Sequence, residues 1–105
     1  MIVVFEKAYL QELYETGRVD GKKYRFQRGV IINYQRCIKI LLGASGVEAL
    51  YRMHSLSYEV LKGNKQGISS IRVNKQYRIE FRIDKSNGES LVSICNILDL
   101  SNHYK

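Results

Sequence analysis

Hydrophobic residues in the first half of the chain recur with helical spacing. Residues 6–16 place apolar side chains three and four positions apart, and Gly17 follows them. Residues 27–42 carry a longer stripe of the same kind, formed by Val30, Ile31, Tyr34, Ile38, Leu41 and Leu42. Such spacing places apolar side chains on one face of an amphipathic helix. The pattern predicts helices over residues 6–16 and 27–42, and one or two further helical turns over residues 47–53.

Shorter apolar segments predict the strands, which lie at residues 2–5, 58–62, 68–73 and 91–98. Residues 77–84 alternate most regularly, with Tyr77, Ile79, Phe81 and Ile83 on one face and Arg78, Glu80, Arg82 and Asp84 on the other. This alternation indicates an antiparallel strand with one buried face and one polar face toward water. We therefore expect one α+β domain over residues 1–105. In it, an N-terminal strand and two helices pack on a mainly antiparallel meander sheet.

The loops between the predicted strands fix their register. A three-residue loop, Asn74–Gln76, keeps Ile71 and Ile79 together on the core face. A two-residue loop would turn Arg72 toward the core, because a shift of one residue moves every side chain to the opposite face. Farther along the chain, Asn87-Gly88 is a typical hairpin turn and predicts that the last two strands are adjacent.

The three-residue loop has an electrostatic consequence. It sets Arg72 directly across from Arg78, with Arg82 farther along the same face. Like charges that face each other across strands destabilise a sheet. Either Glu80 and Asp84 neutralise the arginines, or the arginines hold an anion. Phosphate suits them, because the guanidinium fork donates two parallel hydrogen bonds.

The charge of the chain suggests a partner. It has 17 Lys and Arg against 10 Asp and Glu, a net charge of +7, and its 8 tyrosines are candidates for stacking on bases. The excess lies in two segments: residues 22–40 hold six basic residues and no acidic one, and residues 62–85 hold seven basic residues against Glu80 and Asp84. This balance indicates a polyanionic partner, most often nucleic acid. The alternative is a solvated basic surface.

Several classes of protein and site are excluded by composition. The two cysteines, Cys37 and Cys95, are too few for a disulfide framework, and no cluster of cysteines and histidines has the spacing of a metal site. Gly63–Gly67 lacks the Gly-Lys-Ser/Thr of a phosphate-binding loop and is interpreted as a turn. The start of the chain is unlike a signal peptide, and no apolar run approaches about 18 residues. We expect a cytoplasmic protein with packed, reduced cysteines, no metal, no cofactor and no membrane partner.

The end of the chain holds two further candidates for chemistry, His103 and Tyr104. They follow the last predicted strand, where the tail can fold back over the arginine face. Histidine, with an unperturbed pKa of about 6.5, exchanges protons near neutral pH. The alternative is a disordered polar C-terminus.

Two stretches resemble the HigB branch of the RelE/ParE toxin superfamily. Leu61-Lys-Gly-Asn-Lys-Gln-Gly67 is similar to the Leu-x-Gly-x-x-x-Gly turn of that branch. Ser70-Ile-Arg-Val-Asn74 and Tyr77-Arg-Ile-Glu-Phe81 resemble its hairpin and the strand that follows. The ending Cys95–Lys105 is also similar to that of HigB-like toxins, although Leu-Ser-Asn follows Asp99 where many of them have Tyr-His.

The resemblance implies the toxin of a type II toxin–antitoxin system. Such a toxin is a small, metal-free endoribonuclease that cuts mRNA on the translating ribosome, by attack of the RNA 2′-hydroxyl on the adjacent phosphate. The implied partners are the ribosome, mRNA and a cognate helix-turn-helix, HigA-like antitoxin. The superfamily also contains ParE-type toxins that act on DNA gyrase without cutting RNA. A non-catalytic gyrase inhibitor or RNA-binding module is therefore the alternative.

The resemblance also suggests roles for individual residues. The reaction needs a proton acceptor, a proton donor and positive charge at the phosphate. The catalytic candidates are Arg78, His103, Tyr104 and Glu59. The candidates for binding RNA phosphate are Arg72, Lys62, Arg82 and Lys65. Arg78 matches the strand arginine of the family, the two tail residues are the expected acid and base, and Glu59 is a further candidate base.

Overall fold

The computed structural model describes residues 1–21, 24–87 and 91–102. Within these residues the elements follow in the order β1 (Ile2–Phe5), α1 (Ala8–Thr16), α2 (Arg28–Gly43), α3 (Val47–Arg52), η2 (His54–Leu56), β2 (Glu59–Val60), η3 (Gly63–Lys65), β3 (Ser69–Arg72), β4 (Arg78–Asn87) and β5 (Leu91–Ser101). The predicted helices and strands are present, and short 3-10 helices, η2 and η3, flank β2. No helix in this part of the chain is long and apolar enough to cross a membrane.

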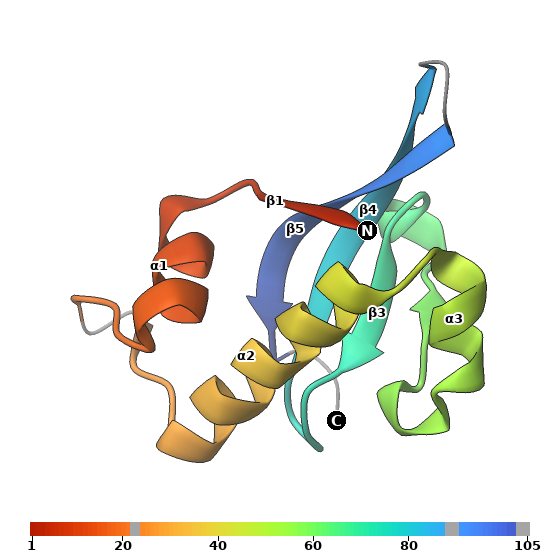
Figure 1. Cartoon of the computed structure of the whole chain (residues 1–105). Coiled ribbons are helices and arrows are strands. Elements are labelled where there is room, and N and C mark those ends of the chain that lie inside the picture. The colour runs from red at the N-terminus through yellow and green to blue at the C-terminus, as the bar shows by residue number, and fades with distance from the viewer. Residues whose placement is uncertain (22–23, 88–90, 103–105) are drawn as a thin grey trace.

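The strands of the described residues form a five-stranded sheet in the order β1-β5-β4-β3-β2. Strands β2 to β5 are antiparallel neighbours, whereas β1 pairs in parallel with β5 at one edge. Helices α1 and α2 pack together over one face of this sheet (Figure 1). The predicted α+β architecture and its meander are therefore confirmed.

The core lies between these helices and the sheet. The buried residues come from both layers: Leu10 and Leu13 from α1, Val30, Tyr34, Cys37, Ile38 and Leu41 from α2, and Ile71, Ile79, Phe81, Cys95 and Ile97 from the sheet. The Tyr34 hydroxyl donates a hydrogen bond of 2.7 Å to the Leu10 carbonyl, which satisfies a polar group inside the core. Burial raises the pKa of the Cys37 thiol to about 11 and that of Cys95 to about 12. Both thiols are packing residues, as expected.

The predicted three-residue loop joins β3 to β4. Ile71 pairs with Ile79, and Arg72 pairs with Arg78. The Asn74 side chain closes the loop, because its Oδ1 accepts hydrogen bonds of 2.8 and 2.7 Å from the amides two and three residues on. The register inferred from the alternation of residues is therefore confirmed.

Strand lengths differ from the prediction at both ends of the meander. Strand β2 spans only Glu59–Val60, because the chain soon turns into η3 at Gly63, whose φ of 67° favours glycine. Strands β4 and β5 run beyond the predicted limits and form a long hairpin (Figure 1). A bulge between Glu80 and Phe81 interrupts their register. The turn predicted at Asn87-Gly88 lies in part outside the described residues.

The first half of the polar face of β4 is more buried than predicted. Arg78 and Glu80 are only 8% and 5% exposed, whereas Arg82 faces water as predicted. The segment from η2 to η3 covers the two buried side chains, since the Ser57 carbonyl contacts Arg78 and the Lys65 ammonium contacts Glu80. Charged groups removed from water must find polar partners. The partners of Arg78 define the candidate site.

Candidate active site

Three neighbouring strands bring several candidate residues to one face of the sheet. Arg72 pairs with Arg78 across β3 and β4, and Glu59 pairs with Ser70 across β2 and β3. Side chains alternate along a strand, so Ser70, Arg72 and Arg78 point away from the face that carries Ile71 and the core. We call this side of β2, β3 and β4 the outer face.

Arg78 is held by groups from two other segments. Its Nε donates a hydrogen bond of 2.9 Å to Ser70 Oγ, and its Nη2 donates to the Ser70 carbonyl at 3.4 Å. Nη2 also donates to the carbonyl oxygen of Ser57 and lies 3.8 Å from Oε2 of Glu59. Ser57 has a φ of 44°, a left-handed conformation that is uncommon outside glycine. Arg78 thus ties β4 to the turn before β2, and its guanidinium is fixed in orientation.

The acidic residues of β4 also have described partners. Glu80 Oε2 lies 2.6 Å from Lys65 Nζ, with the Glu80 side chain 7% exposed and the Lys65 side chain 42% exposed. Asp84 accepts a hydrogen bond from the Asn96 side-chain amide. In the described ion pairs, Glu80 therefore pairs with Lys65, and Glu59 pairs with Arg78.

The other predicted cations are exposed, but they are not equally close to Arg78. Arg72 faces water, and its Nε donates a hydrogen bond of 3.2 Å to the Asn74 carbonyl. Lys62 is exposed between β2 and η3. Arg82 lies four residues beyond Arg78, about 13 Å along the strand at roughly 3.3 Å per residue. The structure therefore brings Arg72 beside Arg78 and leaves Arg82 outside this cluster.

His103 and Tyr104 lie outside the described residues. The strand that precedes them is described, and its last residue, Ser101, pairs with Arg78. Strand β5 therefore carries the chain to the position beside Arg78, two residues before His103.

Comparison with known proteins decides the family. The HigB-like toxin family, described as the RelE-like toxin of the type II toxin–antitoxin system HigB, matches residues 3–99. The chain belongs to this family. Toxin HigB-1 of Vibrio cholerae serotype O1 is 36% identical over 83 residues, which span 78% of this chain and 83% of that protein. The resemblance seen in the hairpin motif is confirmed.

The fold of this HigB-like toxin also occurs in a solved structure. The YoeB/ParE toxin from Agrobacterium tumefaciens superposes with a TM-score of 0.59 at 17% sequence identity, covering 99% of this chain and 100% of that one. The chain is therefore the toxin of a type II toxin–antitoxin system with the RelE-like fold, and its family implies a cognate antitoxin.

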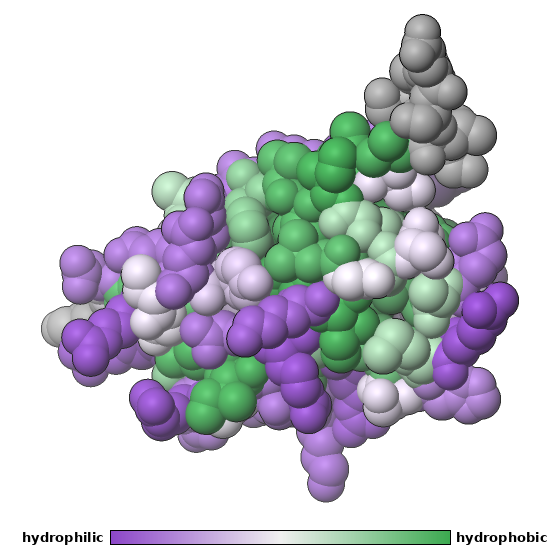
Figure 2. All heavy atoms as spheres, in the orientation of Figure 1, coloured by the Kyte–Doolittle hydropathy of each residue, from purple (hydrophilic) through white to green (hydrophobic). Residues whose placement is uncertain are grey.

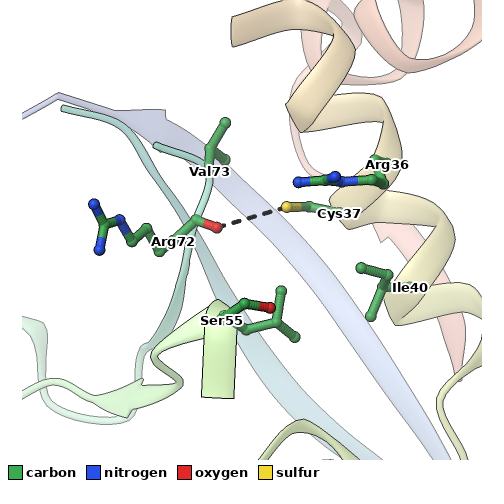
Figure 3. A pocket seen from close by; sticks show the side chains of 7 residues that line it. Arg36, Cys37, Ile40, Ser55, Arg72 and Val73 are labelled. Carbon is green, nitrogen blue, oxygen red and sulfur yellow. Dashed lines mark hydrogen bonds between the residues drawn. The ribbon is translucent and has the colours of Figure 1, made fainter. Parts of the chain in front are cut away.

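A pocket of about 510 Å³ lies between α2, η2 and the end of β3 in the HigB-like toxin (Figure 3). It is lined by Arg36, Cys37, Ile40, Ser55, Leu56, Arg72 and Val73. Figure 3 shows the Arg72 side chain pointing away from α2, while the Arg72 carbonyl accepts a hydrogen bond of 3.7 Å from Cys37 Sγ. The raised pKa of Cys37 makes its thiol a poor nucleophile at neutral pH. Among residues 1–21, 24–87 and 91–102, no group of His, Cys, Asp and Glu side chains is arranged to hold a metal ion.

Ser57 and Ser70 are site residues that the sequence did not single out. Ser70 could have been identified from the sequence, because the predicted register places its hydroxyl on the face of the two arginines, diagonally beside Arg78. Ser57 could not have been identified in this way, since it contacts Arg78 through its backbone carbonyl in a left-handed turn.

Proposed function

We propose that this HigB-like toxin is an mRNA endoribonuclease that acts on the translating ribosome in the cytoplasm and thereby inhibits translation. The observation that carries the proposal is the pairing of a buried, fixed guanidinium with an exposed one, Arg78 with Arg72. Arginines that face each other across strands repel, and the Glu59 carboxylate, 3.8 Å from Arg78 Nη2, offsets part of this charge. An RNA phosphate beside the exposed Arg72 would offset the rest, because a guanidinium donates charge-assisted hydrogen bonds to phosphate oxygens.

The proposed reaction requires no group beyond the RNA and this chain. The 2′-oxygen forms a bond to the adjacent phosphorus and gives its proton to a base. The bond from phosphorus to the 5′-oxygen breaks, and that oxygen takes a proton from an acid. The products are a 2′,3′-cyclic phosphate and a 5′-hydroxyl. Negative charge builds on the phosphorane-like transition state, where donors that are already oriented stabilise it without reorganisation.

Arg78 suits this stabilising role, because Ser70 and Ser57 hold its guanidinium before RNA arrives. Arg72, exposed on the next strand, is proposed to position the phosphate. Lys62 is the proposed flanking RNA contact, whereas Lys65 is engaged by Glu80. Arg82 is proposed to contact RNA farther along β4.

Glu59 is the candidate base on the described part of the outer face. Its side chain is 59% exposed, and its Oε2 lies 3.8 Å from Arg78 Nη2, so a proton acceptor and a cation meet at one place. His103 and Tyr104 are the other proposed acid and base candidates. This assignment rests on the family resemblance and on the arrival of β5 beside Arg78 at Ser101.

Inducing the toxin in bacteria and mapping transcript ends tests the proposal. We expect new 5′-hydroxyl ends inside translated frames, and matching 2′,3′-cyclic phosphates when purified translating ribosomes are treated with the toxin. DNA damage with intact mRNA would instead identify a ParE-type gyrase inhibitor. RNA binding without new ends would identify a non-catalytic RNA-binding module.

Arg72→Ala and Arg52→Ala form a matched pair for this experiment. Each removes one exposed arginine, but Arg52 lies on α3 and not on the outer face. Loss of a phosphate donor is expected to slow cleavage by about 10²-fold. Cleavage should therefore fall in Arg72→Ala and stay at the wild-type rate in Arg52→Ala.

A further inference from the structure

A small pocket of about 220 Å³ lies at the end of β5, between α1, the residues before α2 and the residue before β4. Aromatic rings from these three segments line it, and they form two pairs. Tyr24 stacks on Tyr9, with ring centroids 4.1 Å apart and planes inclined by 13°. Phe26 meets Tyr77 edge to face, with ring centroids 5.6 Å apart. We call this site the aromatic pocket.

Core packing accounts for three of these rings. Tyr9, Phe26 and Tyr77 are partly buried and pack against the hydrophobic core. Tyr24 lies outside that core and packs on the ring of Tyr9. The aromatic cluster therefore extends beyond the core, and a planar ligand in the pocket would contact rings that are already held in place.

Polar groups beside the rings offer directed contacts. Asp99 Oδ1 accepts hydrogen bonds from the Tyr9 hydroxyl at 2.8 Å and the Leu100 amide at 3.0 Å, and it lies 3.6 Å from Lys7 Nζ. All three contacts use the same oxygen, so Oδ2 of this carboxylate, whose side chain is 38% exposed, can accept a donor from a ligand. Arg25 also lines the pocket, is exposed and makes no ion pair within the described residues. Figure 2 shows mainly hydrophilic side chains at this end of the molecule, on the left of the view over α1 and the start of α2.

An unpaired RNA base matches this combination of groups. Bases of single-stranded RNA bind proteins by stacking on aromatic side chains and by hydrogen bonds from their Watson–Crick edges. Each of the four bases carries an N–H donor on that edge, which Asp99 Oδ2 can accept. The phosphate attached to the nucleotide suits the exposed guanidinium of Arg25.

We propose that the aromatic pocket binds a base of the mRNA close to the phosphate that is cut. Ser101 pairs with Arg78 on the outer face, whereas its two neighbours, Leu100 and Asn102, line the pocket. Tyr77 lines the pocket and directly precedes Arg78. The end of the sheet alone separates the two sites, so nucleotides close together in one strand can reach both. The position of the base relative to the cut rests on the proposed cleavage of mRNA, whereas binding of a base does not.

The test measures the affinity of the purified toxin for short RNAs by fluorescence anisotropy, without ribosomes. The probe is fluorescein-labelled hexa-adenylate, and an abasic RNA of the same length reports binding by backbone charge alone. Tyr24→Ala removes the ring that lies outside the core. Tyr51→Ala is the matched control, because Tyr51 is 59% exposed on α3 and pairs edge to face with Tyr58, outside the pocket.

We expect Tyr24→Ala to weaken hexa-adenylate binding by about 10-fold or more, the usual effect of losing a base–aromatic stack. Tyr51→Ala should bind hexa-adenylate like the wild type. The abasic RNA should bind all three proteins equally, because these substitutions change no charge.

Two results would overturn the proposal. The first is a hexa-adenylate affinity that is equal in Tyr24→Ala, Tyr51→Ala and the wild type. The second is wild-type toxin that binds hexa-adenylate no better than the abasic RNA. If Tyr24→Ala unfolds, Arg25→Ala replaces it with Arg52→Ala as its control, since each removes one exposed arginine, and binding must then fall in Arg25→Ala alone. A toxin that binds hexa-adenylate through Tyr24 but leaves mRNA intact would overturn the proposed cleavage and retain the aromatic pocket as a base-binding site.

Discussion

Arg78 and Ser70 meet across β3 and β4 through a 2.9 Å hydrogen bond from the guanidinium Nε to the serine hydroxyl oxygen. Arg78 is 8% exposed and Ser70 is fully buried. Hydrogen bonds to a charged partner are stronger than neutral ones and more costly to lose inside a protein. The contacts that orient the proposed phosphate-binding group therefore also hold the turn at Ser57 against the sheet.

Replacing Ser70 by alanine tests this double role. The change removes the hydroxyl acceptor of Arg78 Nε, and we expect the free energy of unfolding to fall by about 1.5–3 kcal/mol. Ser69→Ala is the matched control, because Ser69 is also buried and its hydroxyl bonds to the neutral Tyr58 hydroxyl at 2.9 Å. That loss should be about 0.5–1.5 kcal/mol. Urea unfolding measures both, and equal losses would show that the Arg78 contact adds nothing.

Arg78→Lys separates the charge of Arg78 from its geometry. Lysine keeps the positive charge but lacks the planar fork that reaches Ser70, Ser57 and a phosphate together. We expect a folded protein whose cleavage of ribosome-bound mRNA is reduced by about 10²–10³-fold. Arg78→Ala should lose as much activity and more stability, because it leaves the Ser70 hydroxyl and the Ser57 carbonyl without their donor. Wild-type cleavage by folded Arg78→Lys would remove Arg78 from the proposed mechanism.

The sequence was sufficient to predict the structural features that depend on residue periodicity and turn chemistry. The alternation in β4 and the loop at Asn74 were sufficient to place Arg72 opposite Arg78. The burial of Arg78 and Glu80 was not predictable in this way, because it depends on a distant, irregular segment that folds over the polar face. That segment has no repeating pattern, and its key group is the backbone carbonyl of Ser57, whose conformation no side-chain pattern encodes.

The buried thiols predict how stability responds to alkaline pH. Burial raises the pKa of Cys37 and Cys95 from an ordinary 9.0 to about 11 and about 12. Above the ordinary value the unfolded chain releases protons that the folded chain keeps, so the free energy of unfolding falls as pH rises. Burial also raises the pKa of Tyr9 and Tyr34, which adds to the loss at higher pH.

Urea unfolding from neutral to alkaline pH measures this effect. We expect the decline to begin near pH 9, the ordinary thiol pKa, and to be shallower in Cys95→Ala than in the wild type. A thiol reagent should modify the folded protein much more slowly than the unfolded one. Stability that stays constant through this range would mean that the thiols ionise equally in both states.

Arg72 on the outer face and Lys39 on α2 lie on opposite sides of the sheet, so one ribosome-bound orientation cannot use both equally. Lys62 is exposed between β2 and η3. Each phosphate contact releases counterions when the toxin binds. Removing one contact therefore makes the plot of log affinity against log salt concentration less steep by about one. We expect this reduction in Arg72→Ala and in Lys62→Ala, and an unchanged slope in Lys39→Ala. Ribosome affinity measured over a series of salt concentrations tests this expectation. A wild-type affinity that does not vary with salt would mean that these charges form a solvated surface and do not contact phosphate.

The C-terminal residues 103–105 test the roles that the family resemblance suggests for His103 and Tyr104. Ser101 pairs with Arg78, so the residues that follow it begin beside the proposed phosphate site. If His103 transfers a proton there, removing residues 103–105 should slow single-turnover cleavage by about 10²–10⁴-fold, the usual contribution of a positioned acid or base. Ribosome binding should survive, because the truncation removes only one basic residue, Lys105. His103→Gln should reproduce most of the loss, and Tyr104→Phe tests the neighbouring hydroxyl separately. Wild-type cleavage by both the truncated protein and His103→Gln would transfer the proton-transfer roles to Lys62 and to Glu59, whose Oε2 lies 3.8 Å from Arg78 Nη2.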